Sequence, residues 1–146
     1  MPSAKKAYQV MLRLIDETGT GAIIDLGSGW GNFVIPLAKR TPERQVIGYE
    51  LSLLPWLISI ILKKALGLKN LRLHRKNFYH ENLPAASVIV CYLYPEAMIK
   101  IADKLKQQQP NIAFLISNNF ALPSQSIIYF LSTFFLTVVF FERDFC

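Results

Sequence analysis

One stretch decides the fold that this sequence predicts: Ile23-Ile24-Asp25-Leu26-Gly27-Ser28-Gly29-Trp30-Gly31. Residues 22–26 form a short apolar run typical of a buried strand, and alternating glycines follow it at once. Glycine lets the backbone turn tightly and approach a ligand without a Cβ clash, and three glycines weaken packing unless something requires them. Because open α/β sheets bind ligands where their strands end, we expect a ligand at this loop rather than a bare turn.

Outward from this loop, the chain alternates short apolar runs with segments of helical periodicity. Such alternation predicts an α/β, Rossmann-like, doubly wound fold with a mostly parallel sheet. The length of 146 residues fits one domain, residues 1–146. The expected helices span residues 3–16, 32–40, 56–66 and 95–108, and the expected strands span residues 22–26, 45–50, 71–74, 86–92 and 112–117.

The run from Ile127 to Phe141 holds fifteen residues without a charge. It is short for a membrane span, which needs about 20 apolar residues. Its many β-branched and aromatic residues favour strands. We therefore expect a C-terminal antiparallel strand pair joined near Ser132-Thr133, and membrane association through residues 127–141 stays open as the alternative.

Two helices carry specific expectations about burial. Ser52 and Pro55 mark the start of the helix 56–66 by capping and by the fixed proline φ. This helix is apolar nearly all round until Lys63, so we expect much of it to be buried. The helix 95–108 places apolar side chains inward and lysines outward. The inner set is Ala97, Ile101 and Leu105, and the outer set is Lys100, Lys104 and Lys106.

Composition narrows the class of protein. With 52% hydrophobic and 18% charged residues, the chain has the material for a core, which excludes intrinsic disorder. The net charge of +6 and the pI of about 9.4 favour anionic partners. Six bases and no acid lie between Leu51 and His80: Lys63, Lys64, Lys69, Arg72, Arg75 and Lys76. This basic run is either a solvated surface or a docking face, and RNA is one possible partner.

Cysteine use gives the expected compartment. Cys91 lies in an apolar run and Cys146 ends the sequence, with no CxxC motif or Cys/His cluster, so no metal site is predicted. The first residues lack the apolar core of a signal peptide. We therefore expect a cytoplasmic protein.

The spacing of the loop decides between ligands. A dinucleotide site has the pattern G-x-G-x-x-G, whereas position 32 is Asn in this chain. Glu50 ends the second predicted strand, 25 positions after Asp25. A carboxylate at that place can accept hydrogen bonds from both hydroxyls of a ribose. The pair of signals predicts a nucleoside-containing ligand other than a dinucleotide.

The spacing D-x-G-x-G-x-G resembles the first motif of class I S-adenosylmethionine-dependent methyltransferases. That resemblance implies S-adenosylmethionine as the cofactor, with the loop and the acid at Asp25 near its amino-acid part and Asn77-Phe78 near its adenine. The cofactor-binding residues implied are Asp25, Gly27, Ser28, Gly29, Gly31, Glu50, Leu51, Asn77 and Phe78.

Further motifs narrow the resemblance. Pro2-Ser3 ahead of a helix, Gly48-Tyr49-Glu50-Leu51, Pro55-Trp56-Leu57 and Arg75-Lys76-Asn77 are similar to the small protein-lysine methyltransferases related to the ATP synthase c-subunit lysine methyltransferase. The likeness covers about residues 2–117 and implies a protein lysine as the methyl acceptor. The chain departs from the family at Asn77, where an Asp is usual, and in a longer turn before Pro55.

The predicted acceptor pocket lies after the fourth strand, at Tyr92-Leu93-Tyr94-Pro95. The rings of Tyr92 and Tyr94 can hold an ammonium by cation–π contact, which makes them the candidate catalytic residues, or they merely cap the core. His74 and His80 have no obvious partner as bases. Two alternatives stay open: an RNA or small-molecule methyltransferase, and a non-catalytic or membrane-attached cofactor-binding module.

Overall fold

The computed structural model describes residues 4–91, 95–108, 112–118, 127–131 and 136–140 of the chain. Helices and strands alternate through most of it, as the sequence predicts. The elements are α1 (Ala4–Asp16), β1 (Ile23–Leu26), α2 (Val34–Arg40), β2 (Val46–Tyr49), α3 (Leu53–Ala65), β3 (Leu71–His74), the 3-10 turn η1 (Phe78–His80), β4 (Ala86–Cys91), α4 (Pro95–Gln108), β5 (Ile112–Asn118), β6 (Ile127–Leu131) and β7 (Leu136–Phe140).

A single sheet runs through the molecule in the order β3-β2-β1-β4-β5-β7-β6. The first five strands are parallel, and the chain reverses direction in the sheet order between β3 and β4. This is the predicted Rossmann-like arrangement, in which the ends of β1 and β4 meet at the point of reversal. Beyond β5, the strand β7 pairs antiparallel with both β5 and β6.

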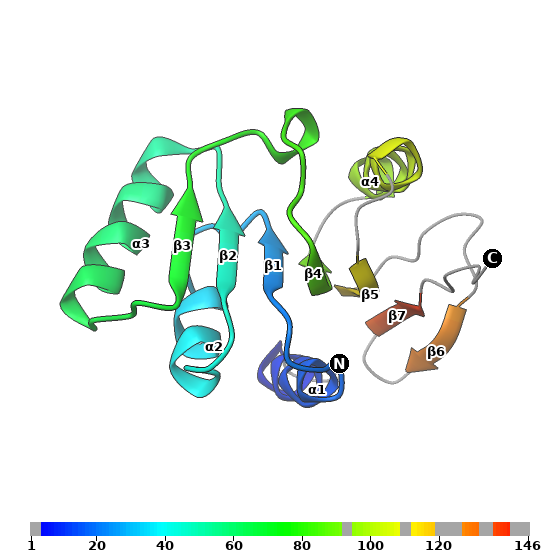
Figure 1. Cartoon of the computed structure of the whole chain (residues 1–146), viewed down its shortest axis with the longest axis horizontal. Helices are drawn as coiled ribbons and strands as arrows, with labels where there is room; N and C mark the ends of the chain where they lie inside the picture. The colour runs from blue at the N-terminus through cyan, green and yellow to red at the C-terminus, as the bar shows by residue number, and fades with distance from the viewer. Residues whose placement is uncertain (1–3, 92–94, 109–111, 119–126, 132–135, 141–146) are drawn as a thin grey trace.

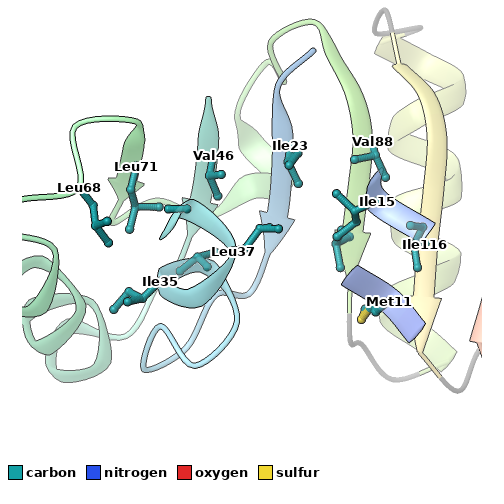
Figure 2. Packing of buried hydrophobic residues seen from close by; sticks show 13 residues of the cluster. Met11, Ile15, Ile23, Ile35, Leu37, Val46, Leu68, Leu71, Val88 and Ile116 are labelled. Atoms are coloured by element: carbon teal, nitrogen blue, oxygen red, sulfur yellow. The ribbon is translucent and has the colours of Figure 1, made fainter. Parts of the chain in front are cut away.

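Helices cover both faces of the sheet (Figure 1). The helices α1 and α2 lie on one face, and α4 lies on the other. Figure 2 shows the first of the two cores, in which Met11 and Ile15 of α1 point toward Val88 and Ile116 of the sheet. Burial of every residue of β1 and β2 explains why both strands read as continuous apolar runs.

The helix α3 corrects a prediction. It begins at Leu53, two residues before Pro55, and Ser52 occupies the N-cap position without a side-chain capping bond. Among its residues only Ser59 is buried, although we expected much of this apolar helix to be buried. The reason is its place: α3 lies beside β3 at the edge of the sheet, where few elements are available to cover it (Figure 1).

The helix α4 departs from its prediction at Lys104, whereas Ala97 is half-buried and the side chain of Lys106 lies outside what the structure describes. Ile101 and Leu105 are buried as expected, and Lys100 is exposed. Lys104, expected on the outer side, is also buried. Its ammonium donates hydrogen bonds to the backbone carbonyls of Tyr79 and Glu81, so it ties η1 to α4. We expected Lys104 to be exposed because η1, whose carbonyl groups accept its hydrogen bonds, was not predicted from the sequence.

The apolar run 127–141 lies in β6 and β7 where it is described. No helix in the described ranges is long and apolar enough to cross a membrane.

Arg44 joins α1 to the start of the sheet from a buried position. Its Nε donates to the Gly21 carbonyl at 2.8 Å, Nη1 to the Ile15 carbonyl at 3.0 Å and Nη2 to Thr18 Oγ1 at 3.2 Å. Burial lowers the pKa of this guanidinium, yet the three acceptors compensate its lost hydration. The side chain therefore fixes the entry of the chain into β1.

We predict that Arg44→Met lowers the free energy of unfolding by about 2–4 kcal/mol, because buried acceptors lose a charged donor. Arg40→Met is the matched control, since Arg40 pairs with Asp16 on the exposed surface and such pairs contribute little. Urea denaturation of both variants checks this. Equal midpoints for the two variants would contradict the role assigned to Arg44.

Candidate functional site

Asp25 is the third residue of β1 and sits between two neighbouring strands. Its register partners are Gly48 of β2 and Val90 of β4. The side chain is 6% exposed. Burial, and then the nearby charge of Glu50, raise the pKa of the Asp25 carboxyl to about 7. A buried carboxylate at the end of a central strand favours a cationic ligand that would neutralise it.

The loop after β1 depends on its glycines. Gly27, Gly29 and Gly31 have φ values of 85°, 55° and 83°, in the left-handed region that side chains other than glycine rarely adopt. A Cβ on Gly31 would lie 2.7 Å from Ile35 Cδ1, so close packing also requires glycine there. A Cβ on Gly29 would meet no atom within 4 Å. The loop is therefore closely packed at Gly31, ahead of α2, and has open space at Gly29.

Glu50 holds the loop in place. Its Oε2 accepts a hydrogen bond from the Gly29 N–H at 2.8 Å, and its Oε1 accepts one from the Ser52 N–H at 2.8 Å. The backbone N–H groups of Gly27 and Ser28 both donate to the Tyr49 carbonyl, one residue earlier. The end of β2 thus fixes the whole first half of the glycine loop.

Ser59 is a residue of this site that the sequence analysis missed. It is 1% exposed, and its hydroxyl lies 3.2 Å from the Gly29 carbonyl and 2.9 Å from the Pro55 carbonyl. The hydroxyl anchors α3 against the loop, and it also requires glycine at position 31, since a Cβ there would lie 3.0 Å from the Ser59 oxygen. The available signal was one small polar residue within the apolar part of the helix that precedes Lys63.

Leu51 follows Glu50 and is exposed, at the same edge of the sheet. Trp30, at the tip of the loop, is exposed as well. The structure therefore brings seven predicted cofactor residues together around the ends of β1 and β2: Asp25, Gly27, Ser28, Gly29, Gly31, Glu50 and Leu51.

Asn77 and Phe78 follow β3, whose last residue accepts a hydrogen bond from the Glu50 N–H. They lie at the same carboxyl edge of the sheet. Asn77 caps η1, because its side-chain oxygen accepts from the Tyr79 N–H at 3.1 Å. Phe78 is half-buried and its ring lies 4.3 Å from that of Tyr79, between centroids. Asn77 thus stabilises the start of η1, a role that the sequence did not predict.

The remaining predicted residues fall into two groups. Tyr92 and Tyr94 lie outside the residues that the structure describes. His74 ends β3, and burial together with Lys76 and Arg72 lowers the pKa of its imidazole. His80 ends η1 and is exposed. A histidine with a lowered pKa, stacked near Tyr49 at 5.4 Å between ring centroids, is consistent with an uncharged side chain at the strand end.

The pH dependence of stability tests the burial of Asp25. Between its ordinary value of 3.8 and about 7, the unfolded chain loses a proton that the folded protein retains. The free energy of unfolding therefore falls as the pH rises through this window, by up to about 1.4 kcal/mol per pH unit. We predict that Asp25→Asn, whose amide is neutral, gains stability relative to the natural protein as the pH rises from 3.8 to about 7, and that the difference levels off above this window.

Urea denaturation at several pH values measures this difference. Subtracting the variant's free energy of unfolding cancels the titration of the other groups. A difference that stays constant across the window would show that the Asp25 carboxyl titrates normally.

Comparison with known proteins agrees with this geometry. Residues 25–127 match the family model described as the ANTKMT methyltransferase domain. The mouse adenine nucleotide translocase lysine N-methyltransferase is 31% identical over 107 residues, covering 71% of this chain and 45% of that protein. The ATP synthase c-subunit lysine N-methyltransferase of Xenopus laevis is 28% identical over 131 residues, covering 85% and 54%. The chain thus spans about half the length of these curated relatives.

Solved structures share the fold. An RNA methyltransferase from Salinibacter ruber, in complex with S-adenosyl-L-homocysteine, has a TM-score of 0.76 at 22% identity and covers 95% of this chain and 91% of its own. PKMT2 from Rickettsia typhi, in complex with AdoHcy, has a TM-score of 0.57 at 21% identity and covers 73% and 22%. The family match begins at Asp25, extends over the glycine loop, Glu50 and Asn77, and covers more than half of the sequence. The chain belongs to the ANTKMT methyltransferase domain family.

Proposed function

We propose that this chain is an S-adenosylmethionine-dependent methyltransferase whose acceptor is a protein lysine. The observation that carries the proposal is the open Gly29 position, held by Glu50, at the end of the strand that carries the buried carboxyl of Asp25. Membership of the family supports it, as do the names of the two lysine N-methyltransferases that the chain resembles.

The residues present fit this cofactor. The Asp25 carboxyl, disfavoured as a buried anion, gains from a cationic amino-acid group beside it. Each Glu50 oxygen accepts one backbone hydrogen bond and keeps a second lone pair for a ribose hydroxyl. Leu51 and Phe78 supply apolar surface for the adenine, with Asn77 at its edge. When bound, S-adenosylmethionine supplies a methyl group on a positively charged sulfur.

The chain's own contribution to transfer is positioning. A lysine must lose its proton before it attacks, and its ordinary pKa is about 10.4. Exclusion of water lowers that pKa by disfavouring the charged form. We assign the wall of the acceptor pocket to Tyr92 and Tyr94, directly after the end of β4, where aromatic rings favour an ammonium by about 0.5–2 kcal/mol.

The proposal has three further parts. The whole chain, residues 1–146, acts as one domain. The strands β6 and β7 close the far edge of its sheet as an antiparallel pair, which the pairing of β7 with β5 supports. The protein works in the cytoplasm, which the free, buried thiol of Cys91 supports, because reducing compartments keep thiols unpaired.

RNA is the second candidate acceptor. The basic run 63–76 favours it, as does the extent of the fold shared with the Salinibacter ruber protein. A phosphate-binding role would make retention of RNA fall steeply with salt. A non-catalytic module is the third reading, and it requires cofactor binding without turnover.

Isothermal titration calorimetry with S-adenosylmethionine tests the cofactor site. We predict that Gly29→Arg weakens binding at least about 100-fold, equivalent to about 2.7 kcal/mol, because its side chain fills the open space at the loop. Gly67→Arg is a matched control: Gly67 also has a positive φ, of 64°, and open space, but it follows α3 at the opposite end of the strands. Equal affinities for the two variants would place the cofactor elsewhere.

A methyl-transfer assay tests the acceptor. The chain and radiolabelled S-adenosylmethionine are added to a cell lysate, and labelled products are digested and identified by mass spectrometry. We predict label on protein lysines, reduced at least about tenfold by Glu50→Ala, since weaker cofactor positioning costs about 1.4 kcal/mol or more. Label that is removed by ribonuclease would replace the lysine proposal with RNA. Binding without any labelled product would favour the non-catalytic module.

A further inference from the structure

The outer surface of α3 is apolar, which is unusual for a helix at the edge of a sheet. Leu54 is 58% exposed, Ile61 is 54% exposed and Leu57 is 41% exposed. These residues are spaced i, i+3, i+7, so they share one face of the helix. Ser59, the buried residue, is two positions from both Leu57 and Ile61, about 200° around the helix. The helix thus turns its polar residue inward and its aliphatic stripe to solvent.

The exposed stripe extends at one end. Leu51 and Leu53 continue it toward the glycine loop, and both are exposed. Contiguous apolar surface of this kind is rare on a monomeric soluble protein and marks a site of interaction. We call it the α3 stripe: Leu51, Leu53, Leu54, Leu57 and Ile61.

Positive charge borders the stripe. Lys64 is exposed on α3, Lys69 is exposed in the segment between α3 and β3, and Arg72 is exposed on β3 itself. The whole stretch from Leu51 to His80 contains six bases and no acid. Since α3 lies beside β3 (Figure 1), the stripe and these bases belong to the same edge of the molecule.

We propose that α3 docks this protein onto an anionic lipid bilayer, with the α3 stripe in the interfacial region and the neighbouring bases among the headgroups. Interfacial helices combine an aliphatic face with lysine and arginine in this way. The attraction of each base to an anionic surface adds to the insertion of the leucines.

The composition of the surface favours lipid over other occupants. Protein interfaces are enriched in aromatic residues and depleted in lysine, whereas the stripe is entirely aliphatic and lysines border it. A second copy of the chain would bring two sets of these bases together without an acid to pair with. RNA binding would employ stacking rings rather than leucines. A bilayer requires no complementary shape: its interior can contact the leucines and its anionic headgroups can contact the bases.

The consequence is an orientation. The stripe begins at Leu51, next to Glu50, and α3 runs along the edge strand β3, so docking would lay this edge of the sheet along the membrane, with the glycine loop at one end of the contact. The proposal concerns α3 alone and does not depend on methyl transfer.

Co-sedimentation with vesicles tests it, using the full chain. One set of vesicles is phosphatidylcholine, and the other contains equal amounts of phosphatidylcholine and phosphatidylglycerol. We expect binding to the anionic vesicles that weakens with salt. Leu57→Gln/Ile61→Gln should reduce the partition coefficient at least about tenfold. Lys64→Gln/Lys69→Gln should reduce it about tenfold on the anionic vesicles and leave binding to phosphatidylcholine unchanged.

Ile99→Gln is the matched control, because Ile99 is an exposed aliphatic residue, 50% exposed, on α4 instead of α3. It should bind vesicles as the natural protein does. All variants alter exposed side chains, so their melting temperatures should match that of the natural protein, and calorimetry with S-adenosylmethionine provides a separate check of the proposed function.

Four outcomes would overturn the proposal. The first is no binding to anionic vesicles by the natural protein. The second is equal binding by Leu57→Gln/Ile61→Gln and Ile99→Gln. The third is a dimer in sedimentation velocity that Leu57→Gln/Ile61→Gln dissociates while vesicle binding persists. The fourth is retention of an RNA oligonucleotide that depends on Lys64 and Lys69 in place of vesicle binding.

Discussion

The hydrogen bond from the Gly29 N–H to the Glu50 carboxylate, at 2.8 Å, is the contact on which the rest of the site depends. The other oxygen of Glu50 accepts from Ser52, the residue before α3. One side chain at the end of β2 thus fixes both the position of the glycine loop and the start of α3. Charged acceptors make stronger hydrogen bonds than neutral ones, so the loop is held without a ligand.

The same arrangement creates an electrostatic cost. Asp25 is buried one strand away from Glu50, and both the burial and the neighbouring charge disfavour its ionised form. A fold that needed only a tight turn would gain from an apolar residue at this position. The carboxyl is better explained by a cationic ligand that offsets the free-energy cost of its buried charge. Groups with shifted pKa values are common at functional sites for this reason.

Local patterns predicted most of the fold because the buried strands and the glycine loop carry signals that involve only neighbouring residues. β1 and β4 read as apolar runs, and the positive φ values of Gly27, Gly29 and Gly31 follow from the motif. Residues whose roles depend on distant acceptors were missed. Ser59 bonds to Gly29, thirty positions away, and Lys104 bonds to the carbonyls of η1. No periodicity within α3 or α4 encodes those partners.

The helix α3 shows why apolar composition alone misled the prediction of burial. Leucine and isoleucine all round a helix indicate surface that avoids water, but the pattern does not say what covers it. The topology places α3 beside the edge strand β3, and the close approach at Ser59 uses only one narrow face. Leu54, Leu57 and Ile61 then face away from the sheet. Exposed aliphatic surface has a free-energy cost in water, so these residues are best explained by contact with the apolar interior of a bilayer. The bases that follow in the sequence favour a bilayer whose headgroups are anionic.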